Sequence, residues 1–168
     1  MRFAVRILLA PMLLVCGALA QDRSLPRFES YPAPQKFTGQ PSPAVIAGQL
    51  ARKYQTRIKL GTRAGPNFAG HYTVVTWGCG SDCRWYAVVD ARTGRVYFNP
   101  NAASVITVPS QDEPSLQFRI DSRLLVVSGY VWGIRGEPRE AKYYYEWRNN
   151  RFSLLRKTGI KRYRSPSA

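Results

Sequence analysis

The segment that decides the fold is residues 67–90, which read NFAGHYTVVTWGCGSDCRWYAVVD. Two runs rich in β-branched and aromatic residues, 71–77 and 84–89, lie on either side of a glycine-containing loop. Such runs separated by a short loop are typical of neighbouring β-strands. The segment therefore predicts two strands joined through a loop that contains Cys79 and Cys83.

The same alternation of strand-like runs and turn residues continues toward the C-terminus. The predicted strands are 57–60, 71–77, 84–89, 95–98, 117–120, 124–130, 142–148 and 152–156. Residues 90–94 place Asp at a turn entry and Gly where a positive φ is needed, and Asn149-Asn150 suits the left-handed region. Both segments predict hairpins, and hairpins in series predict an antiparallel meander.

The N-terminal side of the chain has a different composition. Residues 21–42 are rich in proline and poor in long apolar side chains, which predicts an extended arm without a core of its own. Behind a Ser-Pro pair, apolar residues then recur every four positions, which predicts one amphipathic helix over 43–55. The expected fold class is α+β: a single domain over 43–160, mostly an antiparallel β meander with this helix packed on the sheet.

The first 20 residues have the pattern of a secretory signal peptide. Two arginines precede an apolar run that is too short to cross a bilayer, and Ala18-Leu19-Ala20 is small at both recognition positions. We expect cleavage after Ala20 and a periplasmic or secreted location. Lipoprotein processing at Cys16 is disfavoured, because Val15 stands where a lipobox has a small residue.

Composition and charge narrow the classes of function. The chain has 168 residues, a formal net charge of +15, one His and three Cys. These counts exclude a multi-histidine metal centre and a disulfide-dense scaffold, and we expect no metal and no cofactor. A strongly basic exported chain is expected to meet an anionic envelope component or an acidic protein. We expect no specific nucleic-acid partner, since the sequence contains no recognised nucleic-acid motif.

Residues 65–98 resemble a group of short exported proteins of Gram-negative bacteria. The shared pattern is Asn-Phe-Ala-Gly-His-Tyr, here 67–72, followed by Trp-Gly-Cys-Gly and a second Cys, here 77–83. The resemblance implies an envelope or secreted location. The resemblance implies no catalytic residue, so candidate functional residues have to be inferred from the side chains of this sequence.

Cys79 and Cys83 are predicted to form a structural disulfide. Three residues separate them, and thiols this close in an oxidising compartment are expected to be bonded to each other. The redox or zinc interpretation is weaker, because redox dithiols are usually two residues apart and no further ligands complete a zinc site. Cys16 leaves with the signal peptide.

His71 is the weak candidate for catalysis. It is the only side chain whose ordinary pKa lies near neutrality, so it is the default general base. A hydrolase would also need an orienting carboxylate, for which Asp82, Asp90 and Glu140 are the candidates. The simpler interpretation is a partly buried histidine at the start of a strand.

Basic and aromatic side chains near the C-terminus are the candidate partner-binding residues. They are Arg148, Tyr144, Lys157, Lys161, Arg162 and Arg164. Half of the rings in 143–147 should face the core, and the other half can stack on a ligand beside the cations. Residues 161–168 are predicted to be a basic disordered tail, which would allow peripheral contact with a membrane.

These observations favour a small exported binding protein over an enzyme. An inhibitor or immunity protein is one form that such a binder takes, and its partner would be anionic or acidic. The alternative is a small envelope hydrolase that uses His71 with a carboxylate. The sequence does not specify the oligomeric state.

Overall fold

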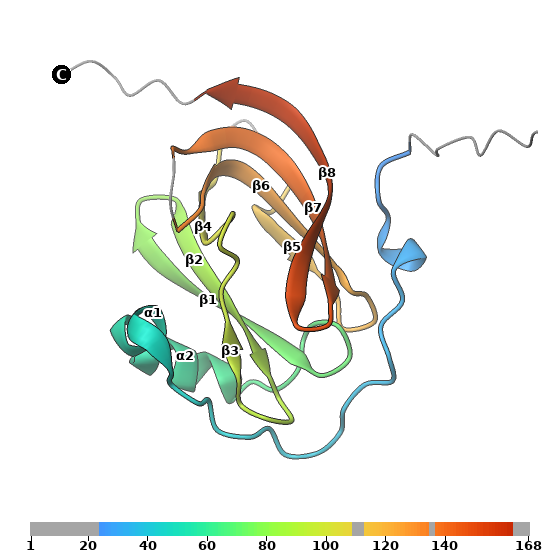
Figure 1. Cartoon of the computed structure of the whole chain (residues 1–168), viewed down its shortest axis with the longest axis vertical. Helices are drawn as coiled ribbons and strands as arrows, with labels where there is room; N and C mark the ends of the chain where they lie inside the picture. Colours follow the sequence, from blue (N-terminus) through green and yellow to red (C-terminus); the bar gives the residue numbers. More distant parts are fainter. Residues whose placement is uncertain (1–23, 109–112, 135–136, 163–168) are drawn as a thin grey trace, which may run out of the picture.

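One antiparallel sheet dominates the structure, a computed structural model that describes residues 24–108, 113–134 and 137–162 (Figure 1). This confirms the mostly antiparallel sheet that the sequence predicts. Its strands are β1 (Tyr72–Gly80), β2 (Cys83–Asp90), β3 (Val96–Tyr97), β4 (Ser104–Ile106), β5 (Leu116–Phe118), β6 (Leu124–Trp132), β7 (Arg139–Arg148) and β8 (Arg151–Arg162). The predicted signal peptide, Cys16 and Arg164 lie outside the described residues.

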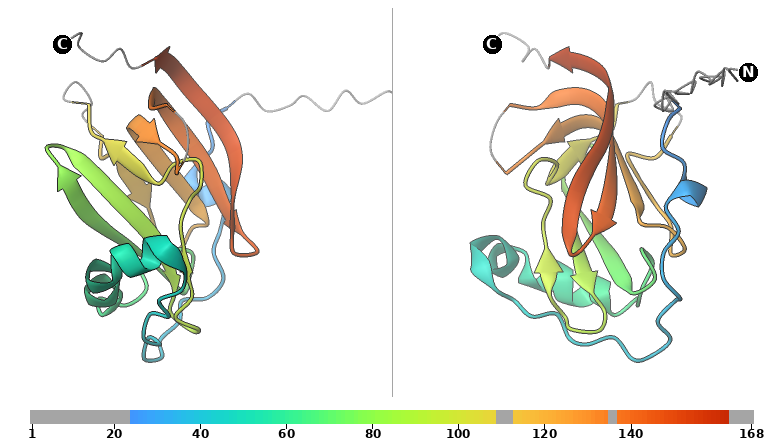
Figure 2. Two further views of the ribbon diagram at one scale, coloured as in Figure 1. Left: turned by 60° about the vertical axis from the view of Figure 1, so that its left-hand side comes forward. Right: turned by 45° about the vertical axis from the view of Figure 1, so that its right-hand side comes forward.

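The strands follow one another across the sheet almost in chain order. The order is β1-β2-β4-β6-β7-β8, with β3 paired to β2 and β5 paired to β6. The sheet is strongly curved (Figure 2). A hydrogen bond of 2.6 Å from Tyr72 Oη to Asn150 Oδ1 links the start of β1 to the turn between β7 and β8. The curvature therefore brings the first strand of the sheet close to the last hairpin.

The inner face of the curved sheet holds a large buried cluster. Its strand residues include Tyr72, Val74, Tyr86, Val88, Val105, Leu125, Val127, Tyr143, Tyr145 and Trp147. Alternate side chains of a strand point to opposite faces, which is why every second residue of β7 from Ala141 to Trp147 belongs to this cluster. Phe68, just before β1, is fully buried in the same cluster, and a buried aromatic side chain of this kind stabilises the fold by roughly 1.5–3 kcal/mol.

Tyr144 of β7 points to the other face, where it is also buried. Its exposed fraction is 3%, and it shares a cluster with Leu124 and Val126, against which Phe28 and Tyr31 of the arm pack. The prediction that Tyr144 offers a partner-binding surface was therefore wrong. Strand alternation places the ring on the outer face, but the arm covers that face.

The proline-rich arm, which in the structure covers residues 24–47, is extended along the outside of the molecule, with one 3-10 turn, η1 (Phe28–Ser30) (Figure 1). The backbone N–H groups of Ala33, Phe37, Ser42 and Val45 donate to the carbonyl oxygens of Asp121, Gly70, Ala91 and Gly94, each at 2.8 Å. The backbone of the arm therefore donates its hydrogen bonds to the segments that connect or precede the strands of the sheet. Because Phe28 of η1 packs against a buried cluster, the arm has more packing than its composition predicts.

Two short helices, α1 (Gly48–Lys53) and α2 (Gln55–Thr62), stand where one helix over 43–55 and a strand over 57–60 are predicted. The strand prediction was wrong, and the helix begins five residues later than expected. Neither α1 nor α2 is long and apolar enough to span a membrane, and the same holds for every other helix of the described ranges.

The burial of α2 explains the failed strand prediction. In a half-buried strand, Ile58 and Leu60 would both point inward. Ile58 is fully buried, but Leu60 is 53% exposed, as expected when the backbone is helical. Ala51 and Ile58 belong to a buried cluster with Val75, Trp77, Ala87 and Val89 of β1 and β2.

Both predicted hairpin turns are present. Between β2 and β3, Asp90 accepts hydrogen bonds from Arg92 N at 2.8 Å and Thr93 Oγ1 at 3.0 Å. Between β7 and β8, Asn149 and Asn150 have φ angles of 52° and 59°. Asn and Asp tolerate the left-handed region better than other non-glycine residues, so the sequence suits the turns it forms.

The last strand is longer than predicted. The sequence suggests a strand over 152–156 and a tail over 161–168, but β8 continues through Arg162, which pairs with Arg139 of β7. The backbone of residues 161 and 162 is therefore strand and not tail. Residues 163–168 lie outside the described ranges.

Candidate anion-binding site

His71 lies directly before β1, and its side chain is 13% exposed. Its Nε2 atom is 3.9 Å from Asp90 Oδ1, which is beyond hydrogen-bond distance. Both carboxylate oxygens of Asp90 already accept hydrogen bonds within the turn, from Arg92 and Thr93. Asp90 therefore fixes the β2–β3 turn and does not orient the imidazole as a carboxylate does in a catalytic triad.

The surroundings of His71 favour the neutral imidazole. Burial lowers the pKa of His71 below its ordinary value of 6.5, the positive charge of Arg92 lowers it further, and Asp90 opposes both effects. Within the described structure, the Nδ1 atom of His71 is buried and has no hydrogen-bond partner. This nitrogen is therefore an unsatisfied polar atom next to the β2–β3 turn, and burial keeps it from solvent.

Cys79 and Cys83 form the predicted disulfide. At about 3.3 Å per strand residue, Cys79 lies about 26 Å from His71 along β1, so a Cys–His nucleophile pair does not form. A loop this short stabilises the fold by about 2 kcal/mol in the chain-entropy model, because closing it restricts the unfolded chain. The disulfide therefore fixes the β1–β2 connection at the end remote from His71.

The other candidate carboxylates lie away from His71. Asp82 is exposed in the disulfide loop, with a φ of 54°. Glu140 faces Tyr130 and Lys161 in the sheet register, at the opposite end of β7 from the turn. No group of three or more His, Cys, Asp or Glu side chains in the described ranges is placed to hold a metal ion.

A cationic site lies at the tip of the β7–β8 hairpin. Arg148 ends β7, Arg151 begins β8, and the two are paired directly across the strands. With Asn149 and Ser153 they line a pocket of about 370 Å³. A second pocket of about 240 Å³ shares Arg148 and Asn149 and is also lined by His71. We call Arg148, Asn149, Arg151 and Ser153 the hairpin-tip site.

The hairpin-tip site has positive charge without a counter-charge. No Asp or Glu lines either pocket, and neither Arg148 nor Arg151 forms an ion pair with any described residue. Like charges directly opposite each other destabilise a strand pair. An anion bound between the two arginines would remove this repulsion, and a guanidinium offers the paired donors that carboxylates and phosphates accept.

The residues that the sequence singles out for partner binding have different positions in the structure. Arg148 is exposed in the hairpin-tip site. Lys157 lies over the ring of Tyr143, 5.0 Å from its centroid. Lys161 and Arg162 continue β8. Arg151 was missed as a site residue, although its place two positions after Asn149 in a two-residue turn indicates a cross-strand partner for Arg148.

Comparisons with known proteins do not extend this description. No protein-family model, no curated protein and no solved structure matches the chain. The geometry and charge of the described residues therefore carry the functional conclusion.

Proposed function

We propose that the protein is an exported binding protein that engages an anionic partner of the cell envelope through the hairpin-tip site. The observation that carries the proposal is the pair Arg148 and Arg151, which face each other across the hairpin without an ion pair to any described residue. Exposed cations with no counter-charge attract anions over about 10 Å at moderate salt.

The turn that carries the site is well fixed, which favours binding. The hydrogen bond from Tyr72 Oη to Asn150 Oδ1 ties the turn to β1. Trp147, just before Arg148, is 2% exposed, and its ring lies 5.1 Å from that of Tyr72. A preorganised site loses less conformational entropy when it binds, so more of the contact energy appears as affinity.

The exported location remains part of the proposal and has two supports. The first is the signal-peptide pattern of residues 1–20, and the second is the Cys79–Cys83 disulfide, which is typical of oxidising compartments. The proposal also keeps the helical segment as a layer packed on β1 and β2, supported by the burial of Ile58 beside Val75.

The partner is either an anionic envelope polymer or lipid, or an acidic protein, as for an inhibitor or immunity protein. The hydrolase alternative has little geometric support. Asp90 is engaged in its turn, and no Ser, Thr or Cys lines the pocket beside His71. A hydrolase with a protein nucleophile would need such a side chain within hydrogen-bond reach of the imidazole.

A pull-down from envelope extract tests the proposal. The purified protein is immobilised, and bound material is eluted first with increasing salt and then with denaturant. Release of one polyanion or acidic protein by salt is expected, because charge-driven contacts weaken as salt screens them. An empty column, or equal retention of neutral and anionic material, would contradict the proposal.

A further inference from the structure

The chain around the two helices has an unusual charge distribution. Residues 30–81 contain six Lys and Arg and no Asp or Glu. Two of these cations lie four positions apart: Lys59 in the last turn of α2, and Arg63 directly after the helix with a helical backbone conformation. Residues four apart project from the same side of a helix, so the two positive charges lie on one face.

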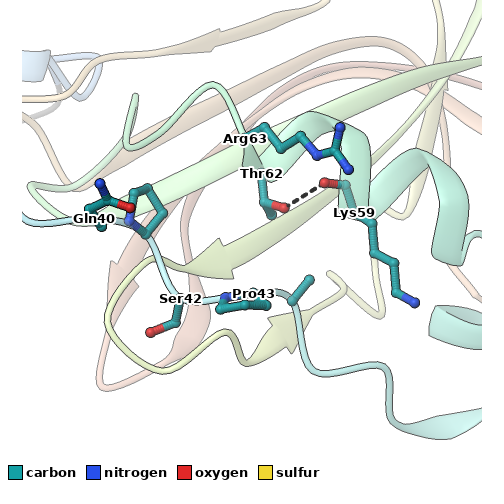
Figure 3. A pocket seen from close by; sticks show the side chains of 8 residues that line it. Gln40, Ser42, Pro43, Lys59, Thr62 and Arg63 are labelled. Carbon is teal, nitrogen blue, oxygen red and sulfur yellow. Dashed lines mark hydrogen bonds between the residues drawn. The ribbon is translucent and has the colours of Figure 1, made fainter.

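These cations line a pocket between α2 and the arm. The pocket has a volume of about 440 Å³, and Figure 3 shows Lys59, Thr62 and Arg63 on the helix side, with Gln40, Ser42 and Pro43 on the arm side. No acidic residue lines it, and neither Lys59 nor Arg63 forms an ion pair with any part of the chain that the structure describes. Its lining thus combines two cations and three polar side chains with Pro41, Pro43 and Ala44, without an internal counter-charge.

The walls of the pocket are fixed by hydrogen bonds that do not involve the charged groups of Lys59 and Arg63. Ser42 Oγ donates to Arg92 O at 2.7 Å, and Thr62 Oγ1 donates to the carbonyl oxygen of Lys59 at 3.0 Å. The arm lies so close to the β2–β3 turn that a Cβ at Gly94 would be 2.0 Å from Pro43 O. The Ser42 hydroxyl thus fixes the arm wall to the β2–β3 turn, and the Thr62 hydroxyl bonds within α2. The side chains of Lys59, Arg63 and Gln40 remain as donors.

We propose that Lys59 and Arg63, with the arm, bind a dianionic phosphate group at a site separate from the hairpin tip. Two unpaired cations match the charge of a terminal phosphate better than that of a monoanionic diester. The ammonium and guanidinium groups both donate charge-assisted hydrogen bonds, which phosphate oxygens accept. Bound phosphate would also relieve the repulsion between two like charges on one helix face.

Titration of the ¹⁵N-labelled protein with inorganic pyrophosphate, at fixed ionic strength, tests the site. We expect saturable shifts at the backbone amides of residues 40–44 and 59–63. The double variant K59Q/R63Q should weaken this binding by about tenfold or more, equivalent to about 1.4 kcal/mol. The monoanion dimethyl phosphate should bind more weakly than pyrophosphate.

A matched control separates this site from general charge. R52Q/R57Q removes the same amount of charge from the exposed sides of α1 and α2, away from the pocket, and should leave the affinity within about twofold. R148Q/R151Q should leave the shifts at 40–44 intact, so failure of the hairpin-tip proposal would not affect this one. Equal weakening by K59Q/R63Q and R52Q/R57Q, or no saturable shifts at the pocket, would overturn the inference.

A second arm distinguishes free from membrane-held phosphate. Vesicles of phosphatidylcholine with phosphatidic acid are sedimented with the protein and with K59Q/R63Q. Loss of sedimentation in the variant would assign a lipid phosphate to the pocket, whereas pyrophosphate binding without sedimentation would assign a free phosphate group. If neither probe depends on Lys59 and Arg63, the pocket is not a phosphate site.

Discussion

Three cations on or beside β5, β6 and β7 are paired with carboxylates, whereas those at the hairpin tip and at the end of α2 form no ion pair with a described residue. The paired contacts are Arg119 with Glu29 at 2.7 Å and Asp121 at 2.8 Å, Arg123 with Glu146 at 2.8 Å, and Lys142 with Glu113. The cations of the two proposed sites, which are Arg148, Arg151, Lys59 and Arg63, form no ion pair with a described residue. The two groups of cations thus differ in whether the described fold supplies a carboxylate beside them.

The paired region holds its carboxylates in the ionised form. A hydrogen bond from Arg119 lowers the pKa of Asp121, and a hydrogen bond from Lys142 lowers the pKa of Glu113. In this region the carboxylates of the chain itself already neutralise Arg119, Arg123 and Lys142. The comparison teaches that a basic side chain indicates a partner only where the fold supplies no acid, which formal net charge does not reveal.

The largest expected effect is on binding at the hairpin-tip site. R148Q/R151Q should lower the affinity for the salt-eluted envelope partner by about 30-fold, at roughly 1 kcal/mol for each basic residue near an anionic surface. R52Q/R57Q is the matched control, since it removes two charges elsewhere. The affinities are measured by titration calorimetry at one salt concentration. An equal loss in both variants would make general charge, and not the site, the cause.

In the paired region the expected effect is on stability. The side chains of Arg123 and Glu146 are 30% and 14% exposed, so E146Q leaves a half-buried guanidinium without its counter-charge. We expect a loss of about 1–2 kcal/mol in the free energy of unfolding, measured by urea denaturation. The control variant is E137Q, which alters an exposed carboxylate without an ion pair to a described residue. It should change the free energy of unfolding little. Unaltered stability in E146Q would show that this pair contributes nothing.

A smaller effect is expected at the exposed pair of Arg119. Its side chain is 46% exposed, and exposed ion pairs contribute little because water and salt screen them. R119Q should destabilise the protein less than E146Q and leave partner affinity within about twofold. The same calorimetric and urea measurements apply. A large loss of affinity in R119Q would mean that paired cations also contact the partner.

The last prediction concerns pH. Because the pKa of His71 is lowered in the folded state, the unfolded chain takes up a proton at a higher pH than the folded protein does. The His71 contribution to stability is thus complete above the ordinary pKa of 6.5 and is lost as pH falls through that value toward the folded pKa. In H71Q the fall in unfolding free energy across this range should be shallower. If the unfolding free energy of H71Q fell with pH as steeply as that of the original protein, the lowered pKa of His71 would be contradicted.

The sequence predicted the features of the fold that are local. The β-branched and aromatic runs in 71–77 and 84–89 predicted two strands, and turn chemistry predicted both hairpins, because these features depend on neighbouring residues. β4 was not predicted, because a strand of three residues is too short for an alternation of apolar and polar side chains to be recognised. The segment 57–60 was assigned to the wrong element because its alternation fits a strand, while only Ile58 is buried.

The site was less predictable, because it depends on contacts between distant residues. The burial of Tyr144 under the arm comes from residues more than 100 positions away. The cationic character of Arg148 is visible in the sequence, but the absence of a described acid beside it is a property of the fold. The same holds for His71, whose nearest carboxylate turned out to be engaged in a turn.

Mapping the contact surface tests the central claim most directly. The ¹⁵N-labelled protein is titrated with the salt-eluted envelope partner, and shifts are followed along the backbone. We expect the largest shifts at the amides of residues 148–153, with smaller ones at His71. The largest shifts at residues 52–57, or shifts spread evenly over all exposed cations, would contradict the assignment of binding to the hairpin-tip site.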